Sequence, residues 1–295
     1  MRIVILGAGA IGSLFGGFLA GKHDVTLVCR QDHALAIQKE GLKITGLSDF
    51  HVRPKAVTSV EGLEPPEILF LTVKAYDTEK ALEDARAIMS PETILVSLQN
   101  GLGNLEIISK KMPDARFVVG ITSQGAILRA PGNVEHTGQS YTIVGGSTDA
   151  VKVAELLNDS DIETTVSNDI QAEIWYKAIV NAVINPLGTL LKGRNGLILE
   201  RPELQKLVKR IIQEGVDVAL ARHISIDPSM ALSKVMQVAT ETANNICSMR
   251  LDVEKSRRTE IMQMNGAIAS YGKEAGISTP VNSLLTSLVR ALEPI

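Results

Sequence analysis

Three polar side chains in an otherwise apolar stretch are the first feature of this sequence that suggests chemistry. Lys177, Asn181 and Asn185 are spaced four residues apart, with isoleucine and valine between them. On a helix, this spacing stacks the three side chains along one face. Asparagine is a weak helix former that prefers caps and turns. The pattern fits a polar seam that satisfies neighbouring backbone groups, or a lysine held by amide side chains beside a reacting carbonyl.

A second polar group follows near the end of the chain. Residues 245–249 read Asn-Ile-Cys-Ser-Met, and Glu260 opens an amide-rich apolar stretch at residues 259–266. A buried carboxylate is costly unless it is paired, and Lys177 would pair it across a cleft between two domains. Alternatively, Glu260 lies at a helix start, where an acid favours the helix dipole. Composition alone leaves both interpretations open.

A glycine-rich turn at the N-terminus predicts a dinucleotide site. Residues 2–6 form an apolar run typical of a buried parallel strand, and GAGAIG follows before a helical run to about residue 20. The first glycine permits the turn, the second lets the backbone approach a pyrophosphate, and the third allows close helix–strand packing. The helix N-terminus offers N–H groups to phosphate. An apolar run at residues 24–29 then completes a βαβ unit.

The same segment resembles a membrane span or a signal peptide in its composition. Residues 3–20 are apolar apart from Ser13, and Arg2 precedes them. Five glycines interrupt this run, however, and three of them have the spacing of the nucleotide-binding turn. We therefore expect a buried strand, a tight turn and a buried helix, and no membrane partner.

The end of the second predicted strand indicates which cofactor binds. An acidic residue there would accept hydrogen bonds from the ribose hydroxyls of NAD, but this chain has Cys29-Arg30-Gln31. A guanidinium pairs well with a 2′-phosphate, so Arg30 favours NADP(H). The alternative for Arg30 is a solvated surface position, and Asp32 argues against the NADP interpretation.

Two more polar residues follow predicted strands. The predicted strand at residues 67–73 is followed directly by Lys74. The predicted strand at residues 93–98 is followed by Gln99 and then by Asn100. Ligands of open α/β sheets lie at the carboxyl ends of the strands. Lys74 would then reach cofactor phosphate or ribose, and Asn100 would hold the nicotinamide or the substrate. The alternatives are a surface lysine and a turn asparagine, since Asn-Gly is a strong turn dipeptide.

The elements that must position these residues divide the chain in two. Strands and helices alternate up to residue 168 and helices alone follow, so we expect an α/β domain at residues 1–168 and a helical domain at 169–295. We expect the helix that carries Lys177 to kink or end at Pro186. The remaining predicted strands are 117–128, 141–144 and 163–166, and the predicted helices are 77–88, 149–157, 170–190, 202–222, 228–247, 258–275 and 280–292.

Composition excludes several classes of function. A formal net charge of -3 with no long run of like charge removes the footprint of a nucleic-acid partner. Two cysteines without a pairing pattern predict a reduced, cytoplasmic protein, and the five histidines have no ligand spacing that would predict a metal site. Apolar helices in the second half would support a homodimer.

Taken together, these blocks resemble the ketopantoate reductase (2-dehydropantoate 2-reductase) family over the whole chain. The matching blocks are GAGAIG, TVKAYDT, QNGLG, PGNVEHTG, WYKAIVNAVINPL with RNG behind it, and NNICSM followed by RRTEIMQMNG. The resemblance implies an N-terminal Rossmann-type domain and an all-helical C-terminal domain, as in 6-phosphogluconate dehydrogenase. Cys247, where a serine is common, and the Arg250-Leu251 pair depart from the pattern.

The resemblance also implies a role for each matching residue. Lys177 resembles the general acid, and Glu260 resembles the acid that hydrogen-bonds the substrate hydroxyl. The implied substrate contacts are Asn100, Asn181, Asn185, Asn195, Asn245 and Ser248. The predicted cofactor contacts are Gly7, Gly9, Ala10, Ile11, Gly12, Arg30, Lys74, Asn100 and Glu260.

The implied reaction is NADPH-dependent reduction of the C2 carbonyl of ketopantoate to (R)-pantoate, in pantothenate and coenzyme A biosynthesis. Burial would lower the pKa of Lys177 and Glu260 would raise it, so the sequence leaves the direction open. The alternatives are a reductase of a different small-molecule 2-oxo acid and a non-catalytic NADP-binding sensor. The helical second half and the missing acid after the second strand argue against a methyltransferase.

Overall fold

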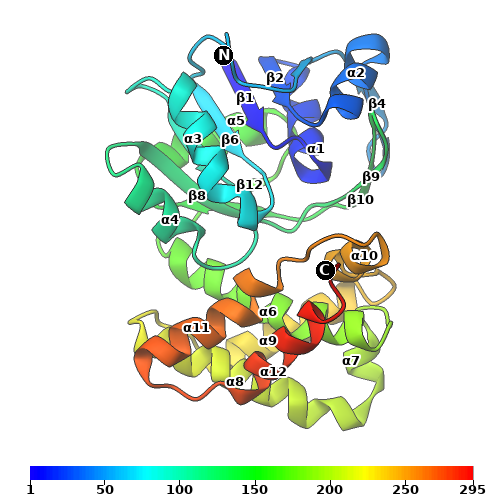
Figure 1. The fold of residues 1–295 in the computed structure, drawn as a ribbon, viewed down its shortest axis with the longest axis vertical. Helices are drawn as coiled ribbons and strands as arrows, with labels where there is room; N and C mark the ends of the chain where they lie inside the picture. Colours follow the sequence, from blue (N-terminus) through cyan, green and yellow to red (C-terminus); the bar gives the residue numbers. More distant parts are fainter. Residues whose placement is uncertain (295) are drawn as a thin grey trace. The chain divides into compact units, whose positions relative to one another are not determined.

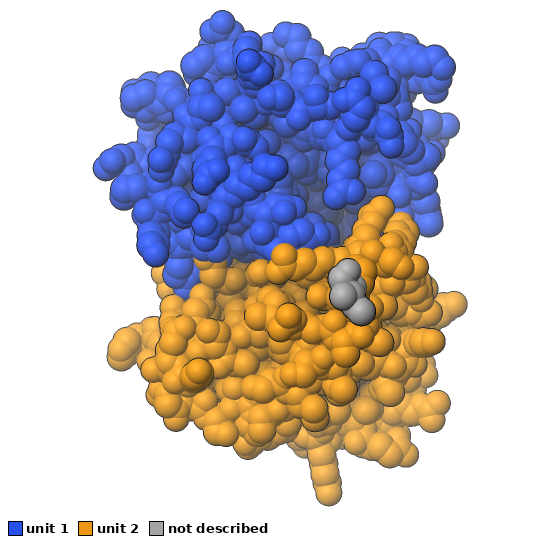
Figure 2. Space-filling view, viewed as in Figure 1, with its two compact units in different colours: residues 1–99, 104–170 blue, residues 100–103, 171–295 orange. Residues whose placement is uncertain are grey.

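The computed structural model describes residues 1–294, which form two compact units. Unit 1 contains residues 1–99 and 104–170 (Figure 2). Unit 2 contains residues 100–103 and the chain from Gln171 onward. In the described part of the chain, no helix has the length and apolar character needed to cross a membrane.

Unit 1 is built on an eight-stranded sheet with the order β12-β11-β8-β7-β6-β1-β2-β5 (Figure 1). From β5 to β8 every neighbouring pair is parallel, and β11 is antiparallel to β8. The six parallel strands have the 3-2-1-4-5-6 order of dinucleotide-binding folds, and this order reverses between β1 and β6. The strands are β1 (Arg2–Leu6), β2 (Asp24–Val28), β5 (Lys55–Val57), β6 (Ile68–Leu71), β7 (Ile94–Ser97), β8 (Arg116–Thr122), β11 (Thr142–Gly145) and β12 (Thr164–Val166).

Helices cover both faces of this sheet because its strands are apolar on both sides. In β1, Ile3 and Ile5 belong to one buried cluster, and Val4 and Leu6 belong to another. The first cluster includes residues of α1 (Ala10–Ala20), α2 (Gln31–Glu40) and α5 (Asp149–Asp159). The second includes residues of α3 (Thr78–Ile88), which follows the 3-10 turn η1 (Ala75–Asp77), and of α4 (Asn104–Lys111).

A second, four-stranded sheet packs on α1. Its order is β4-β3-β10-β9, formed by β3 (Leu42–Gly46), β4 (Phe50–Val52), β9 (Gly125–Ala130) and β10 (Asn133–Gly138). On one side of α1, a Cβ at Gly16 would lie 2.4 Å from Leu27 Cδ2 of β2. On another side, the rings of Phe18 and Phe50 are 5.1 Å apart. The apolar, glycine-rich N-terminus is therefore a helix buried between two sheets.

Unit 2 is helical, as predicted, and its core surrounds α6 (Ile170–Leu190). Ile179 and Val183 are fully buried in one cluster with Ile211 of α8 and Val235 of α9. The other helices are α7 (Leu197–Glu200), α8 (Gln205–Ala221), α9 (Pro228–Glu241), α10 (Ser248–Glu254), α11 (Asn265–Ala275) and α12 (Pro280–Arg290), with 3-10 turns η2 (Pro202–Leu204) and η3 (Ile261–Gln263).

Several predicted boundaries are wrong. The single strand expected at 117–128 is two strands in different sheets, β8 and β9, because the chain changes sheet at residues 123–124. The helix expected at 228–247 ends at Glu241, where the turn-forming Thr-Ala-Asn-Asn run follows. The helix expected at 258–275 begins only at Asn265, so Glu260 lies in a bend before η3.

Pro186 does not end α6, which runs on to Leu190. A proline inside a helix removes the N–H that would bond the carbonyl four residues earlier, here that of Ala182. The Asn265 side chain takes this place, since its Nδ2 donates to Ala182 O over 2.9 Å. A side chain distant in sequence thus satisfies the carbonyl that proline leaves without a backbone partner.

Candidate functional site

The glycine turn of unit 1 connects β1 to α1. Gly7 has a φ of 95°, and a Cβ there would lie 2.5 Å from the Val73 backbone nitrogen. The N–H groups of Gly7 and Ala8 donate to Val28 O at the end of β2. At exposed Gly9 the nearest atom to an added Cβ is 3.9 Å away. The turn is therefore packed tightly on the sheet at Gly7 and open at Gly9.

The first turn of α1 offers backbone donors beside this opening. The helical hydrogen bonds begin with Ser13 N to Gly9 O at 3.0 Å, and no side chain caps the helix. The N–H groups of Ala10, Ile11 and Gly12 precede that first bond and are left for a ligand. Open space at Gly9 and uncapped donors at a helix N-terminus fit the pyrophosphate of a dinucleotide.

Lys74 lies next to the glycine turn, at the point where the strand order reverses. Thr72, which follows β6, donates from its backbone nitrogen to Leu6 O and from its hydroxyl to Gly7 O, at 2.9 and 3.0 Å. Half-buried Lys74 lies two residues beyond it, before η1. Thr72 was not predicted to lie at this site. A hydroxyl residue directly after an apolar strand is nevertheless a signal for a hydrogen bond to the neighbouring glycine turn.

Arg30 lies at the end of β2, where the sequence predicts the adenosine ribose. It is exposed and forms the N-cap position of α2, with Asp32 in the first turn of that helix. The guanidinium is thus presented to solvent beyond the strand end, in a position that suits a 2′-phosphate.

A buried serine–histidine contact in unit 1 resembles an activated nucleophile but is structural. His33 Nδ1 accepts from Gly132 N at 2.9 Å, so the proton of the neutral ring is on Nε2, which donates to Ser13 Oγ. Burial also lowers the pKa of His33. The Ser13 hydroxyl donates in turn to Ala8 O at 3.2 Å. This histidine cannot accept the serine proton, and the pair instead supports the glycine turn.

Lys177 is the centre of the polar cluster in unit 2. Its Nζ donates to Asn100 Oδ1 over 2.9 Å. Burial lowers the pKa of Lys177 to about 8, and the attraction of the Glu260 carboxylate opposes that shift. Glu260 itself is 5% exposed. The structure therefore brings Lys177, Asn100 and Glu260 together within one unit.

Asn100 is held by a short segment that packs on η3. Gly101 and Gly103 have φ values of 87° and 93°, a conformation that favours glycine. Between them, buried Leu102 donates from its backbone nitrogen to Gln263 O at 2.7 Å. A Cβ at Gly101 would lie 2.5 Å from the same oxygen. The Asn-Gly pair is therefore a sharp turn that also fixes the partner of Lys177.

The two asparagines of α6 have different surroundings. Asn185 is 6% exposed, and its Nδ2 donates to Met264 Sδ at 3.4 Å. Asn181 is half-buried, one helical turn from Lys177 on the same face. Asn100 supplies an amide that contacts the lysine, and the substrate roles of Asn181 and Asn185 stay predictions.

Asn195 and Asn245 lie in two adjacent loop segments of unit 2. Asn195 N donates to Asn245 O, and Asn195 Nδ2 donates to Thr242 Oγ1, both at 2.9 Å. The Asn195 Oδ1 is buried without a protein partner. Asn245 and Ser248 are exposed, and Ser248 begins α10. Their side chains are thus available to a ligand.

Cys247 connects the Ser248 segment to the end of α6. It is buried, and its Sγ lies 3.5 Å from Asn185 O and 3.7 Å from Thr189 Oγ1. Burial raises the pKa of its thiol. A thiol at this position packs in the apolar interior and leaves Ser248 exposed.

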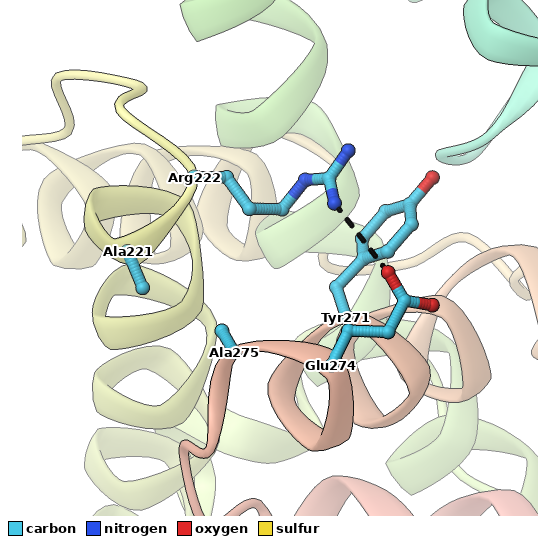
Figure 3. Close-up of a pocket in the computed structure, with 5 residues that line it drawn as sticks. All are labelled: Ala221, Arg222, Tyr271, Glu274 and Ala275. Carbon is cyan, nitrogen blue, oxygen red and sulfur yellow. Dashed lines mark ion pairs between the residues drawn. The ribbon is translucent and has the colours of Figure 1, made fainter.

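A surface pocket on unit 2 is separate from these residues. It is lined by Ala221, Arg222, Tyr271, Glu274 and Ala275, from the end of α8 and from α11 (Figure 3). The guanidinium carbon of Arg222 lies 3.8 Å from the centre of the Tyr271 ring, and Arg222 pairs with Glu274. Among the described residues, no cluster of histidine, cysteine, aspartate and glutamate could hold a metal ion.

Comparison with known proteins gives one consistent result along the chain. Residues 3–149 match the family described as "Ketopantoate reductase PanE/ApbA", and residues 169–293 match "Ketopantoate reductase PanE/ApbA C terminal". The 2-dehydropantoate 2-reductase of Pyrococcus abyssi (strain GE5 / Orsay) is 41% identical over 302 residues, which cover 100% of this chain and 99% of that protein.

Two solved structures share the fold over nearly the whole length. The ternary structure of D-mandelate dehydrogenase with NADH and anilino(oxo)acetate has a TM-score of 0.93 at 30% identity and covers 99% of this chain and 98% of its own. The 2-dehydropantoate 2-reductase from Geobacter metallireducens GS-15 has a TM-score of 0.92 at 26% identity, with 99% of each chain covered.

Proposed function

The chain belongs to the ketopantoate reductase family, and we propose from this premise that it is a cytoplasmic enzyme that reduces 2-dehydropantoate to (R)-pantoate with NADPH. The observation that carries the proposal is the contact of Lys177 with Asn100 in the presence of Glu260. A sensor that only bound a dinucleotide would have no use for a half-buried proton donor of this kind.

Lys177 is the general acid of the proposed reaction. When hydride reaches the C2 carbonyl carbon, negative charge develops on the carbonyl oxygen, and a cation beside that oxygen stabilises it. A general acid works best when its pKa is close to the operating pH, and the Lys177 pKa of about 8 meets this condition. Asn100 holds Nζ through its Oδ1, which fixes the direction from which the proton is given.

Glu260 and the neighbouring amides are the proposed substrate contacts. Glu260 would accept a hydrogen bond from the substrate hydroxyl, and its charge keeps Lys177 protonated to higher pH. Asn181, Asn185, Asn195, Asn245 and Ser248 would bind the remaining polar groups of the substrate. The buried, unpartnered Asn195 Oδ1 supports this role because such an acceptor gains from a ligand donor.

NADPH supplies the hydride when it is bound. We propose that the Gly7–Gly12 turn and the N–H groups of Ala10, Ile11 and Gly12 bind its pyrophosphate. Arg30 would pair with the 2′-phosphate, and Lys74 would contact a phosphate or ribose near the glycine turn. Asn100 and Glu260 complete the proposed cofactor contacts.

Steady-state rates with a panel of 2-oxo acids test the function directly. We expect kcat/KM to be highest for ketopantoate with NADPH, and lower by at least about tenfold for ketopantoate with NADH. The neighbouring D-mandelate dehydrogenase structure contains NADH, so a preference for NADH or for an aromatic 2-oxo acid is the specific outcome that would contradict the proposal. Dinucleotide binding without turnover of any 2-oxo acid would instead indicate a sensor.

The contribution of Arg30 can be measured separately. Arg30→Ala should lower kcat/KM for NADPH about tenfold, the effect of one exposed charged hydrogen bond, and should leave kcat/KM for NADH unchanged. Asp32→Ala is the matched control, because Asp32 is also exposed in the first turn of α2. If Arg30→Ala lowers kcat/KM equally with NADPH and with NADH, Arg30 does not bind the 2′-phosphate.

The pH dependence of reduction should follow the protonation of Lys177. The acid form is present below its pKa of about 8, so kcat should be level near pH 7 and fall tenfold per pH unit well above 8. In Glu260→Gln, the influence that raises this pKa is lost, and the fall should begin at a lower pH. If the pH profile of Glu260→Gln is the same as that of the wild type, Glu260 does not raise the pKa of Lys177.

A further inference from the structure

The α6 helix lacks one backbone hydrogen bond in the turn between two of its polar residues. Pro186 has no N–H, so Ala182 O lacks its partner one turn later. Ala182 is fully buried, so water cannot easily replace that partner. The gap falls between Asn181 and Asn185, the two amides that follow Lys177 along the helix.

Asn265 fills this gap. It is fully buried at the start of α11, and its Nδ2 donates to Ala182 O at 2.9 Å and to Asn282 Oδ1 at 3.0 Å. Both hydrogens of one amide group are therefore used. The Asn265 Oδ1 is buried without a partner, so the side chain is placed for its donors alone.

A neighbouring carboxylate fixes which way these amides face. The amide nitrogen of Asn282 donates to Glu214 Oε2 at 2.9 Å, and Glu214 also accepts from the Asn282 and Val281 backbone nitrogens. Since a carboxylate only accepts, Asn282 must turn its oxygen toward Asn265. Asn265 in turn must present its NH2 group. The oxygen and nitrogen of an asparagine side chain are often hard to tell apart, and this chain of contacts assigns them for both residues.

The same chain segment reaches the other members of the unit 2 cluster. Glu260 attracts Lys177, Gln263 O accepts from Leu102 N in the segment of Asn100, and Met264 Sδ accepts from Asn185. Asn265 adds the contact to the backbone of α6. Residues 260–265 therefore contact both α6 and the segment that carries Asn100.

From these contacts, we propose that Asn265 is a positioning residue for the reaction: its amide replaces the N–H that Pro186 lacks and so fixes the turn of α6 between Asn181 and Asn185. It touches neither substrate nor cofactor. This inference rests on the proposed function for the roles of Lys177, Asn181 and Asn185. It states that the hydrogen bond from Asn265 to Ala182 O keeps those three side chains in place.

A double-mutant cycle tests this bond, because Pro186→Ala restores a backbone N–H for Ala182 O. Asn265→Leu, which keeps the branched shape of the side chain and removes the donor, should lower kcat for ketopantoate about 10- to 100-fold, in the range of couplings between contacting residues. The KM for NADPH should not change. Adding Pro186→Ala should return kcat to within about threefold of the Pro186→Ala single variant.

A control separates positioning from loss of stability. Asp227 caps α9 by accepting from the backbone nitrogens of Ser229 and Met230, and Asp227→Ala should lower the melting temperature without lowering kcat. Pro186→Ala should not rescue that variant. If Asn265→Leu does not fold, recovery of folding and turnover in the double variant supports the same bond.

A double variant as slow, or as unfolded, as Asn265→Leu would overturn the proposal. Failure of the proposed function has a different signature, since the wild-type protein would then not reduce ketopantoate at all. In that case the coupling between residues 186 and 265 still shows in the melting temperatures of the four proteins.

Discussion

In Lys177→Ala, kcat for ketopantoate reduction is expected to fall about 10²- to 10⁴-fold, the contribution typical of a general acid. The ammonium group of this lysine is bonded to Asn100 and attracted by Glu260. Removing it leaves the developing alkoxide without a proton and without a neighbouring cation. The dissociation constant for NADPH, measured by fluorescence titration, should stay within about twofold, because the glycine turn is unchanged.

Lys177→Arg distinguishes the charge of the lysine from its proton. A guanidinium keeps the cation, but its pKa is far above that of an amine and makes it a poor proton donor, so Lys177→Arg should stay far below the wild-type rate. Recovery in Lys177→Arg to near-normal turnover would reduce the lysine to an electrostatic role. Near-normal turnover in Lys177→Ala would remove Lys177 from the mechanism altogether.

The individual elements of the site were more predictable than the contacts between them. The four-residue spacing of Lys177, Asn181 and Asn185 predicts a shared helix face, and α6 provides it. The bond from Lys177 to Asn100 joins residues 77 positions apart. No local pattern encodes such a pairing, because it depends on how the 100–103 segment packs on η3.

Pro186 shows the same limit in the backbone. Its chemistry predicts a kink or an end of the helix. The helix does not end there, and Asn265 satisfies the carbonyl that proline leaves without a backbone partner. A tertiary hydrogen bond here outweighs the local tendency of proline to end a helix. That bond comes from a helix start 83 residues away from Ala182, so the sequence around Pro186 contains no sign of it.

The fold itself was predictable where the apolar pattern was strong. The strands around the glycine turn are continuous apolar runs, and the confirmed α/β sheet follows from them. The helix at residues 31–40 and three strands of the small sheet, β3, β4 and β10, were missed. Those strands are short and partly exposed, and that helix starts with a polar Gln-Asp-His run, so neither gives a clear periodic signal.

Gly9→Ala should weaken NADPH binding without weakening the fold. The φ of Gly9 is -82°, outside the left-handed region that favours glycine, and the nearest atom beyond its chain neighbours lies 3.9 Å from an added Cβ. If the pyrophosphate approaches the backbone here, the methyl group displaces it and its hydrogen bonds to the N–H groups. Loss of one charged hydrogen bond raises the dissociation constant on the order of 10- to 100-fold. The melting temperature without cofactor should not change.

Gly12→Ala is the matched comparison, because its effect should appear in the fold. A Cβ at Gly12 would lie 2.4 Å from Thr72 Oγ1 and 2.9 Å from Gly7 O, and overpacking of this kind costs about 1–3 kcal/mol. Gly12→Ala should therefore melt at a lower temperature even without cofactor. Wild-type affinity for NADPH in Gly9→Ala would show that the pyrophosphate does not approach this turn, whatever the result at Gly12.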